Sequence, residues 1–325
     1  MSKPKIFIDG HAGTTGLRIR DWLTSRTDLE LWTLPEADRK SESARKNAIA
    51  ESDLTILCLP DDAAKQAAQW AAEAGARLID ASSSHRVSDG WVYGLPELTP
   101  EQRGHIQAAR FVTNPGCYAS AFVALLRPLI DKELVAPDAG LSIHGLSGYS
   151  GGGKSLIERW ESPAEQRLGL HFEAPYALER IHKHIPEMQC YSGLAVAPQF
   201  RPAVGPFRCG MRVEVPLHQS LFGEDSGQDS NTNGEAVWQT LADRYRDEPF
   251  VEVAAFRGIE PVDDFSLDPT SLNDTNRMVL HVLPNSAGHV LVVALLDNLG
   301  KGASGVAIQS LNLMLDLGET TGLPS

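Results

Sequence analysis

The first 115 or so residues alternate short apolar strands with helical stretches, and this alternation constrains the fold more than any other feature of the chain. The strands are apolar nearly throughout rather than at every second position. Strands of this kind are buried on both faces, as in a parallel sheet with helices on either side. We therefore predict a Rossmann-type α/β domain, with strands at Lys5–Asp9, Leu29–Leu34, Asp53–Leu59, Arg77–Asp80 and Phe111–Thr113.

From residue 116 the strands become longer and few helices separate them, which is typical of an α+β domain with a mixed or antiparallel sheet. We assign residues 116–297 to this second domain. The apolar-faced helix Ala303–Leu315 is expected to pack back on the first domain, which then comprises residues 1–115 and about 298–325. Strands of the second domain are expected at Gly140–His144, Ala195–Phe200, Met211–Leu217, Met278–Leu283 and His289–Leu295.

Local signals place several helices and one loop. Gly75 is a helix stop after an Ala-rich stretch. The polar, Gly/Ser/Asn-rich residues 219–233 predict a mobile loop. Helices are expected at Leu17–Thr24, Ala63–Ala74, Ala119–Ile130 and Gly234–Arg246.

A glycine-rich turn, Gly10-x-x-Gly13-Thr14-Thr15-Gly16, joins the first strand to the first helix. Glycines at such a junction permit a tight turn and the close approach of a pyrophosphate, which the N–H groups of the helix start can bind. The spacing differs from the usual G-x-G-x-x-G, and a purely structural turn is the alternative. We expect this loop to bind a nucleotide, and we count Pro60, after the strand Asp53–Leu59, among the cofactor contacts.

The segment after the second strand carries charges of both signs. Glu36 and Asp38 can accept a hydrogen bond from the ribose hydroxyl of NAD, whereas Arg39 and Lys40 can bind the 2′-phosphate of NADP. The alternative is that all four line a solvated loop. We favour NADP as the cofactor.

Cys117 follows Asn114-Pro115-Gly116 and precedes an apolar helix. The dipole at a helix start stabilises a thiolate, which is the nucleophilic form of cysteine. The alternative is a buried structural thiol. Cys58, Cys190 and Cys209 lie in or beside strands, without such a turn, and the spacing of the four cysteines fits neither a disulfide framework nor a zinc site. We expect free thiols and a cytoplasmic protein.

The run His182-Lys183-His184-Ile185-Pro186-Glu187 offers the proton-transfer partner that a thiolate nucleophile needs. Histidines two residues apart would project to the same side of an extended segment, and Glu187 can orient one of them. A basic surface loop is the alternative. No third ligand is suggested nearby, so we expect no metal site.

A second glycine-rich run extends from Gly145 to Ser155 and includes Ser147, Gly148 and Lys154. Such a loop ahead of a helix can cradle a phosphate with its backbone N–H groups. The run matches the G-x-x-x-x-G-K-[ST] pattern of a P-loop ATPase, but no magnesium-binding Asp strand accompanies it, and we disfavour that interpretation. Candidate cations for the substrate's carboxylate and phosphate are Arg86, Lys154 and Arg208.

The net charge of −13 argues against nucleic acid and anionic membranes as partners, because both require a basic surface. No apolar run approaches the roughly 18–20 residues of a membrane span. We expect a small-molecule substrate, no nucleic acid and no membrane.

Together these runs resemble the short-form N-acetyl-γ-glutamyl-phosphate reductases, within the aspartate-semialdehyde-dehydrogenase-like superfamily. The resemblance extends over nearly the whole chain. The combination of the cysteine with His-x-His-x-Pro-Glu is specific, whereas the first glycine loop alone is not. The matching runs are Gly10–Leu17, Tyr93–Leu98, Asn114–Tyr118, Gly145–Lys154, His182–Glu187 and Leu296–Gln309.

The resemblance implies NADPH-dependent reduction of N-acetyl-glutamyl 5-phosphate to N-acetyl-glutamate 5-semialdehyde in arginine biosynthesis, through a thioester on Cys117. It makes His182 the acid/base residue, with His184 and Glu187 in support. It also implies a catalytic second domain, and it places Asn298, Lys301 and Gly302 near the nicotinamide. Because a domain with a mixed sheet often pairs through that sheet, we expect a homodimer or homotetramer. Competing hypotheses are a related reductase of aspartyl or aminoadipyl phosphate and a nucleotide-sensing regulator that has lost catalysis.

Overall fold

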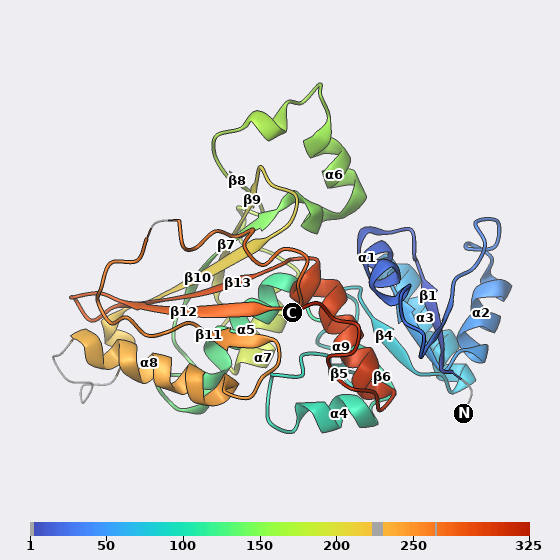
Figure 1. Cartoon of the computed structure of the whole chain (residues 1–325), viewed down its shortest axis with the longest axis horizontal. Helices are drawn as coiled ribbons and strands as arrows, with labels where there is room; N and C mark the ends of the chain where they lie inside the picture. Colours follow the sequence, from blue (N-terminus) through green and yellow to red (C-terminus); the bar gives the residue numbers. More distant parts are fainter. Residues whose placement is uncertain (1–2, 223–229, 264) are drawn as a thin grey trace. The chain divides into compact units, whose positions relative to one another are not determined.

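The computed structural model describes residues 3–222, 230–263 and 265–325. The chain forms two compact units, which Figure 1 shows with every element coloured by sequence. Unit 1 contains the residues up to Pro115 together with Ala303–Pro324, and unit 2 contains Gly116–Gly302. Among the described residues, no helix has both the length and the hydropathy that a membrane span requires.

Unit 1 is built on a six-stranded sheet in the order β2-β1-β3-β4-β6-β5, and every neighbouring pair in it is parallel. The predicted Rossmann-type α/β fold is therefore confirmed. Its strands are β1 (Lys5–Asp9), β2 (Glu30–Trp32), β3 (Leu54–Leu57), β4 (Leu78–Asp80), β5 (Val92–Tyr93) and β6 (Phe111–Thr113). Its helices are α1 (Thr14–Leu23), α2 (Glu42–Glu51), α3 (Asp61–Ala74), α4 (Gln102–Ala108) and α9 (Gly305–Met314).

Alternate residues of β1 face the two apolar layers of unit 1. Ile6 and Ile8 pack in the layer that holds α1, α4 and α9, whereas Phe7 packs in the layer that holds α2 and α3. Because both faces of the strand are covered, its sequence is apolar at consecutive positions. Helix α3 ends as expected at Gly75, which adopts the left-handed conformation at φ 74°.

Unit 2 is built on a seven-stranded mixed sheet in the order β11-β12-β13-β10-β7-β9-β8, which confirms the α+β prediction. Its strands are β7 (Ser142–Gly148), β8 (Ala174–Pro175), β9 (Gln199–Gly205), β10 (Met211–Leu217), β11 (Val251–Val253), β12 (Met278–Pro284) and β13 (Val290–Leu296). Its α-helices are α5 (Cys117–Asp131), α6 (Gly153–Glu161), α7 (Ile185–Ser192) and α8 (Ser230–Tyr245).

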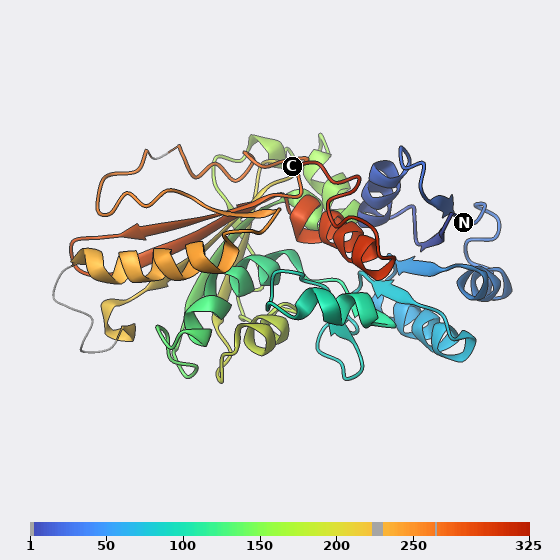
Figure 2. The same ribbon diagram turned by 60° about the horizontal axis from the view of Figure 1, so that its bottom comes forward.

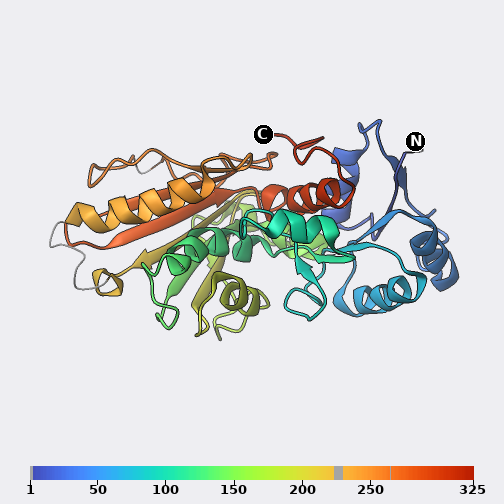
Figure 3. The same cartoon turned by 90° about the horizontal axis from the view of Figure 1, so that it is seen from below.

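The strand β10 alternates buried and less buried residues, and Met211, Val213 and Val215 enter the main core of unit 2. Helices α5 and α8 pack in the same core, so they cover one face of the mixed sheet (Figures 2 and 3). Helix α5 is buried along almost its whole length. A helix held in this way is a rigid support for the residues at its start.

Several predicted boundaries in unit 2 are wrong. β9 was expected at Ala195–Phe200 but runs over Gln199–Gly205, because Arg201, Pro202 and the residues after them continue the parallel pairing with β7. β7 itself extends to Gly148, into the run predicted as a loop. The proline and glycines that weaken the strand signal in these segments are accommodated by sheet pairing.

The polar run 219–233 is not a loop throughout. Residues Gln219–Leu221 form a 3-10 turn and α8 begins at Ser230, while residues 223–229, which fall within the same prediction, lie outside the described residues. Asn233 donates a hydrogen bond from Nδ2 to the Gly288 carbonyl at 3.1 Å. This buried contact offsets the poor helix propensity of the asparagine.

Candidate active site

Cys117 is the first residue of α5, two positions earlier than the helix predicted from Ala119. Gly116, the residue before it, is extended at φ −78° and ψ 141°, and no side chain caps the helix start. The first N–H groups of such a helix have no partner within the helix, and the helix dipole is positive there. This environment favours a thiolate on Cys117 and can stabilise an oxyanion beside it.

Glu187 anchors the turn that carries Cys117. The Gly116 N–H donates to Glu187 Oε2 at 2.9 Å, and the Glu187 side chain is fully buried. Its other oxygen lies 4.0 Å from His184 Nε2, and His184 is itself 4% exposed. The structure thus brings together Glu187, His184 and the backbone directly before Cys117.

His182 and His184 lie in a turn before α7 rather than in the extended segment that was expected, so that prediction is wrong. The turn nevertheless brings the two rings together, with their centroids 4.8 Å apart. The backbone N–H of His184 donates a hydrogen bond to Nδ1 of the His182 ring at 3.2 Å. Because Nδ1 accepts this bond, the proton of a neutral His182 ring is on Nε2, which is then a donor.

Aromatic rings surround the two histidines. Tyr118 lies 5.7 Å from His184 between ring centroids, and His182 lies 5.1 Å from Phe200 and 5.8 Å from Tyr176. Burial raises the pKa of Tyr118 well above its ordinary value and the pKa of Tyr176 to about 12. Both phenols therefore keep their protons at neutral pH and remain hydrogen-bond donors.

Two glycines are required by the packing around Cys117. A Cβ atom on Gly302 would lie 2.7 Å from the Cβ of Cys117, so a side chain there would force Cys117 or the segment that carries residue 302 to move. A Cβ atom on Gly145 would lie 2.5 Å from Cε1 of Tyr118, whose ring packs on this part of β7. The contact between Gly302 and Cys117 was not anticipated, because 185 positions of sequence separate them and the spacing gives no signal.

The closing segment around residues 298–302 belongs to unit 2. Asn298 accepts a hydrogen bond from the Gly210 N–H at 2.8 Å and donates one to Ser150 Oγ at 3.0 Å. Lys301 is fully buried, with its Nζ 5.6 Å from the ring centroid of Phe250. Asn298 therefore connects the segments around Gly210 and Ser150. The nicotinamide contacts expected of Asn298, Lys301 and Gly302 remain a prediction.

Three N–H groups in the second glycine-rich run bond to the protein's own backbone. The N–H groups of Gly148, Tyr149 and Ser150 donate to the carbonyls of Gly210, Phe207 and Arg208 at 2.8 to 3.0 Å. They cannot then bind a phosphate, as a P-loop would require. A Cβ atom on Gly148 would lie 2.4 Å from the Arg208 carbonyl oxygen, so the packing requires a glycine here. Ser147, directly before it, is 3% exposed.

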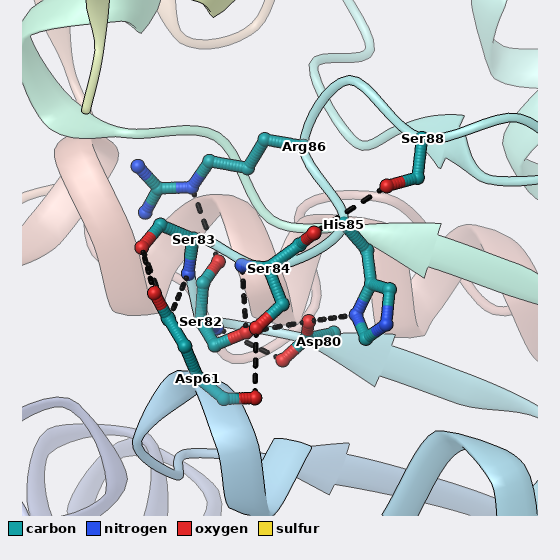
Figure 4. Close-up of polar contacts among 8 residues, drawn as sticks. All are labelled: Asp61, Asp80, Ser82, Ser83, Ser84, His85, Arg86 and Ser88. Atoms are coloured by element: carbon teal, nitrogen blue, oxygen red, sulfur yellow. Dashed lines mark hydrogen bonds and ion pairs between the residues drawn. The ribbon is translucent and has the colours of Figure 1, made fainter. Parts of the chain in front are cut away.

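The three candidate cations differ in their surroundings. The side chains of Lys154 and Arg208 are 80% and 62% exposed, and they pair with Glu158 and Glu161. Arg86, in unit 1, is 8% exposed and donates from Nε to the Ser82 carbonyl at 3.1 Å (Figure 4). Of the three, Arg86 has the fixed and desolvated environment that an anion-binding arginine needs.

The first glycine loop of unit 1 has the features of a nucleotide-binding turn. Gly10 adopts φ 89°, and a Cβ atom there would lie 2.2 Å from the Cys58 carbonyl oxygen at the end of β3. A Cβ atom on Gly16 would lie 2.6 Å from the Gly10 carbonyl oxygen. Helix α1 begins at Thr14 after Gly13, without a side-chain cap. The turn follows β1, where the strand order reverses, and open α/β sheets bind ligands at this point.

The charges predicted to distinguish NAD from NADP interact with each other. Arg39 Nε lies 2.7 Å from Glu36 Oε1, and both side chains are exposed. Lys40 follows in the same exposed turn. Across the described residues, no group of three His, Cys, Asp or Glu side chains is arranged to bind a metal ion.

Comparisons with known proteins match two separate parts of the chain. Residues 10–106 match the family described as semialdehyde dehydrogenase, NAD binding domain, and residues 117–298 match semialdehyde dehydrogenase, dimerisation domain. The chain is 45% identical to N-acetyl-gamma-glutamyl-phosphate reductase of Trichormus variabilis, over 99% of this chain and 100% of that protein. It is 44% identical to N-acetyl-gamma-glutamyl-phosphate reductase 2 of Pseudomonas putida, over 97% and 98%.

Solved structures with a similar fold include aspartate semialdehyde dehydrogenase II of Vibrio cholerae. The TM-score is 0.72 at 17% identity, covering 97% of this chain and 99% of that one. Aspartate semialdehyde dehydrogenase with NADP from Candida albicans matches at a TM-score of 0.67 and 18% identity, covering 97% and 99%. At this level of identity the likeness establishes the fold alone.

Proposed function

The chain belongs to the semialdehyde dehydrogenase family and, within it, to the N-acetyl-gamma-glutamyl-phosphate reductases, and from this premise we propose how it acts. It reduces N-acetyl-glutamyl 5-phosphate to N-acetyl-glutamate 5-semialdehyde and phosphate with NADPH, a reaction of arginine biosynthesis. The observation that carries the proposal is Cys117 at the uncapped start of α5, with the buried Glu187 fixing the residue before it.

The residues of unit 1 fit the dinucleotide. Gly10 has the positive φ of a tight turn, and the start of α1 offers N–H groups to a pyrophosphate. Bound NADPH supplies the hydride that reduces a thioester carbonyl. The residues that would hold the cofactor are Gly10, Gly13, Thr14, Thr15, Gly16, Arg39, Lys40 and Pro60, with Asn298, Lys301 and Gly302 as further contacts.

Cys117 divides one difficult reduction into two easier steps. Its thiolate attacks the carbonyl carbon of the acyl phosphate, the C–S bond forms, and the C–O bond to phosphate breaks, leaving a thioester. After reduction, the tetrahedral carbon expels the Cys117 thiolate as the C–S bond breaks, and the aldehyde is released. The N–H of Cys117 stabilises the oxyanion of each tetrahedral intermediate.

His182 serves as the acid/base residue of this cycle. Its Nδ1 already accepts the His184 N–H, so Nε2 is the atom that donates to the carbonyl oxygen as negative charge develops. His184 and Glu187 act behind it, because both are buried and Glu187 also fixes Gly116. Arg86 binds the phosphate group, with Ser147, Gly148, Lys154 and Arg208 as further substrate contacts.

Unit 2 forms the interface of a homodimer or homotetramer in this proposal. The support is the description of the matching family, which names residues 117–298 as a dimerisation domain. We place the protein in the cytoplasm, because none of its four cysteines, all among the described residues, forms a disulfide. Sedimentation at several protein concentrations measures the assembly, and a monomer at every concentration would contradict it.

The direct test is phosphate-dependent oxidation of N-acetyl-glutamate semialdehyde, followed by the absorbance of NADPH. We expect turnover with NADP and slower turnover with NAD. The same assay with aspartate semialdehyde and with aminoadipate semialdehyde separates the related reductases, and both should react poorly. Absence of NADPH formation with the N-acetylated substrate would overturn the proposed function.

A further inference from the structure

A buried carboxylate lies at the carboxyl end of β4, under the turn that leads to Arg86. The Asp80 side chain is fully buried and accepts three hydrogen bonds (Figure 4). The Ser82 N–H donates at 2.9 Å, Ser82 Oγ at 2.7 Å and His85 Nδ1 at 2.6 Å. A buried carboxylate that accepts several short hydrogen bonds holds its donors in a single arrangement.

Ser82 transmits this arrangement to Arg86. Its carbonyl oxygen accepts the Arg86 Nε–H at 3.1 Å, while its Oγ accepts the Ser84 N–H at 3.1 Å. The guanidinium group is planar, so a hydrogen bond at Nε together with burial fixes the orientation of the whole group. An arginine held in this way loses little side-chain entropy when it binds an anion.

His85 is fixed on its other side by aromatic rings. Its imidazole stacks on Trp91 at 4.1 Å and an interplanar angle of 11°, and Trp91 stacks on Phe111 at 5.0 Å. Figure 4 shows the side chains of His85 and Arg86 extending in different directions from the same turn. The histidine therefore supports Asp80 from one side while the arginine extends from the other.

A second acidic residue, Asp61, holds the same turn through Ser83 and Ser84. Asp61, at the start of α3, accepts from the Ser83 N–H at 3.0 Å and from Ser83 Oγ at 2.8 Å. The Ser83 hydroxyl donates to Asp61 rather than to Asp80, so Ser83→Ala serves as an internal control.

We propose that Asp80 is a positioning residue which, through Ser82 and with the support of His85, orients Arg86 to bind the phosphate group of the acyl phosphate. This inference rests on the proposed function, in which Arg86 binds that phosphate. Asp80 itself contacts neither substrate nor cofactor. Its effect therefore falls on the binding of phosphate rather than on the reaction at Cys117.

The test measures the phosphate-dependent oxidation of N-acetyl-glutamate semialdehyde with NADP, with phosphate varied at saturating aldehyde and NADP. Asp80→Asn keeps the size of the side chain and should raise the KM for phosphate about tenfold, the effect of one lost charge-assisted hydrogen bond. The KM for aldehyde should change less than about twofold. His85→Phe keeps the stacked ring but removes the Nδ1 donor, and should raise the phosphate KM in the same direction. Ser83→Ala should resemble the wild type.

A double-mutant cycle separates positioning from a general structural effect. If Asp80 acts through Arg86, Asp80→Asn should add little to the phosphate KM of Arg86→Lys. Three results would overturn the inference. The effects of Asp80→Asn and Arg86→Lys on the phosphate KM would be fully additive, the phosphate KM would be unchanged in both Asp80→Asn and His85→Phe, or only the aldehyde KM would rise. If Asp80→Asn does not fold, the same cycle is run with His85→Phe. A wild-type protein without phosphate-dependent activity would instead contradict the proposed function.

Discussion

Replacing Gly302 by alanine tests whether close packing fixes the position of the thiol. The added Cβ atom would lie 2.7 Å from the Cβ of Cys117 and 3.2 Å from the Asp297 carbonyl oxygen. Carbon atoms in favourable contact lie about 3.5–4.0 Å apart, so roughly 1 Å has to be absorbed by movement of Cys117 or of the segment that carries Gly302. Overpacking of this kind costs about 1–3 kcal/mol of stability.

The larger effect is expected on catalysis. A displacement of about 1 Å in a reacting group lowers the rate by about 10²-fold, so kcat should fall by that order while the protein remains folded. The assay combines kcat, the thermal unfolding midpoint and the rate at which iodoacetamide alkylates Cys117. Gly104→Ala is the matched control, because nothing lies within 4 Å of a Cβ atom at that helical position. Wild-type kcat and alkylation in Gly302→Ala would refute the reasoning.

Two further predictions concern a buried carboxylate and a paired histidine. Glu187→Ala leaves the buried Gly116 N–H without its acceptor, and should lower the free energy of unfolding by about 1–3 kcal/mol in urea titrations; Glu187→Gln should lose less. The hydrogen bond with Glu214, and then the negative charge of Glu173, raises the pKa of His144 above its ordinary value of 6.5. The protonated pair stabilises the fold fully below that value, and the contribution is lost as pH rises through the raised pKa. The urea midpoint should therefore fall above about pH 6.5 by more in the wild type than in His144→Gln; equal slopes would contradict this.

The sequence was sufficient to predict five of the six strands in the sheet of unit 1 and the turn that precedes Cys117. Consecutive apolar residues such as Ile6, Phe7 and Ile8 occur where both faces of a strand are covered, and this is a local signal. The turn before Cys117 is also predicted from adjacent residues, Asn114-Pro115-Gly116. The start of helix α5 at residue 117 rather than 119 could not be predicted, because Cys117 and Tyr118 carry no helix-start signal of their own.

The supports of the site depend on contacts between distant residues. Glu187 and Gly116 are 71 positions apart, so the sequence indicated only that Glu187 can orient a histidine. The run from Gly145 to Ser155 has the composition of a phosphate loop, but the N–H groups of residues 148–150 donate to backbone carbonyls of residues 207–210. The sequence does contain a signal for Asp80 and His85. Both lie at or just after the end of a buried parallel strand, where polar residues often belong to a site.

The central claim is that Cys117 carries the acyl group as a thioester. The most direct measurement mixes the enzyme with N-acetyl-glutamate semialdehyde and NADP in the absence of phosphate, then combines rapid absorbance with peptide mass spectrometry after acid quenching. We expect a burst of NADPH equivalent to the active sites, and an N-acetylglutamyl adduct on the peptide that contains Cys117. Added phosphate should remove the adduct, and Cys117→Ser should show neither burst nor adduct. Turnover with no burst and no adduct on Cys117, or an adduct on another residue, would contradict the account.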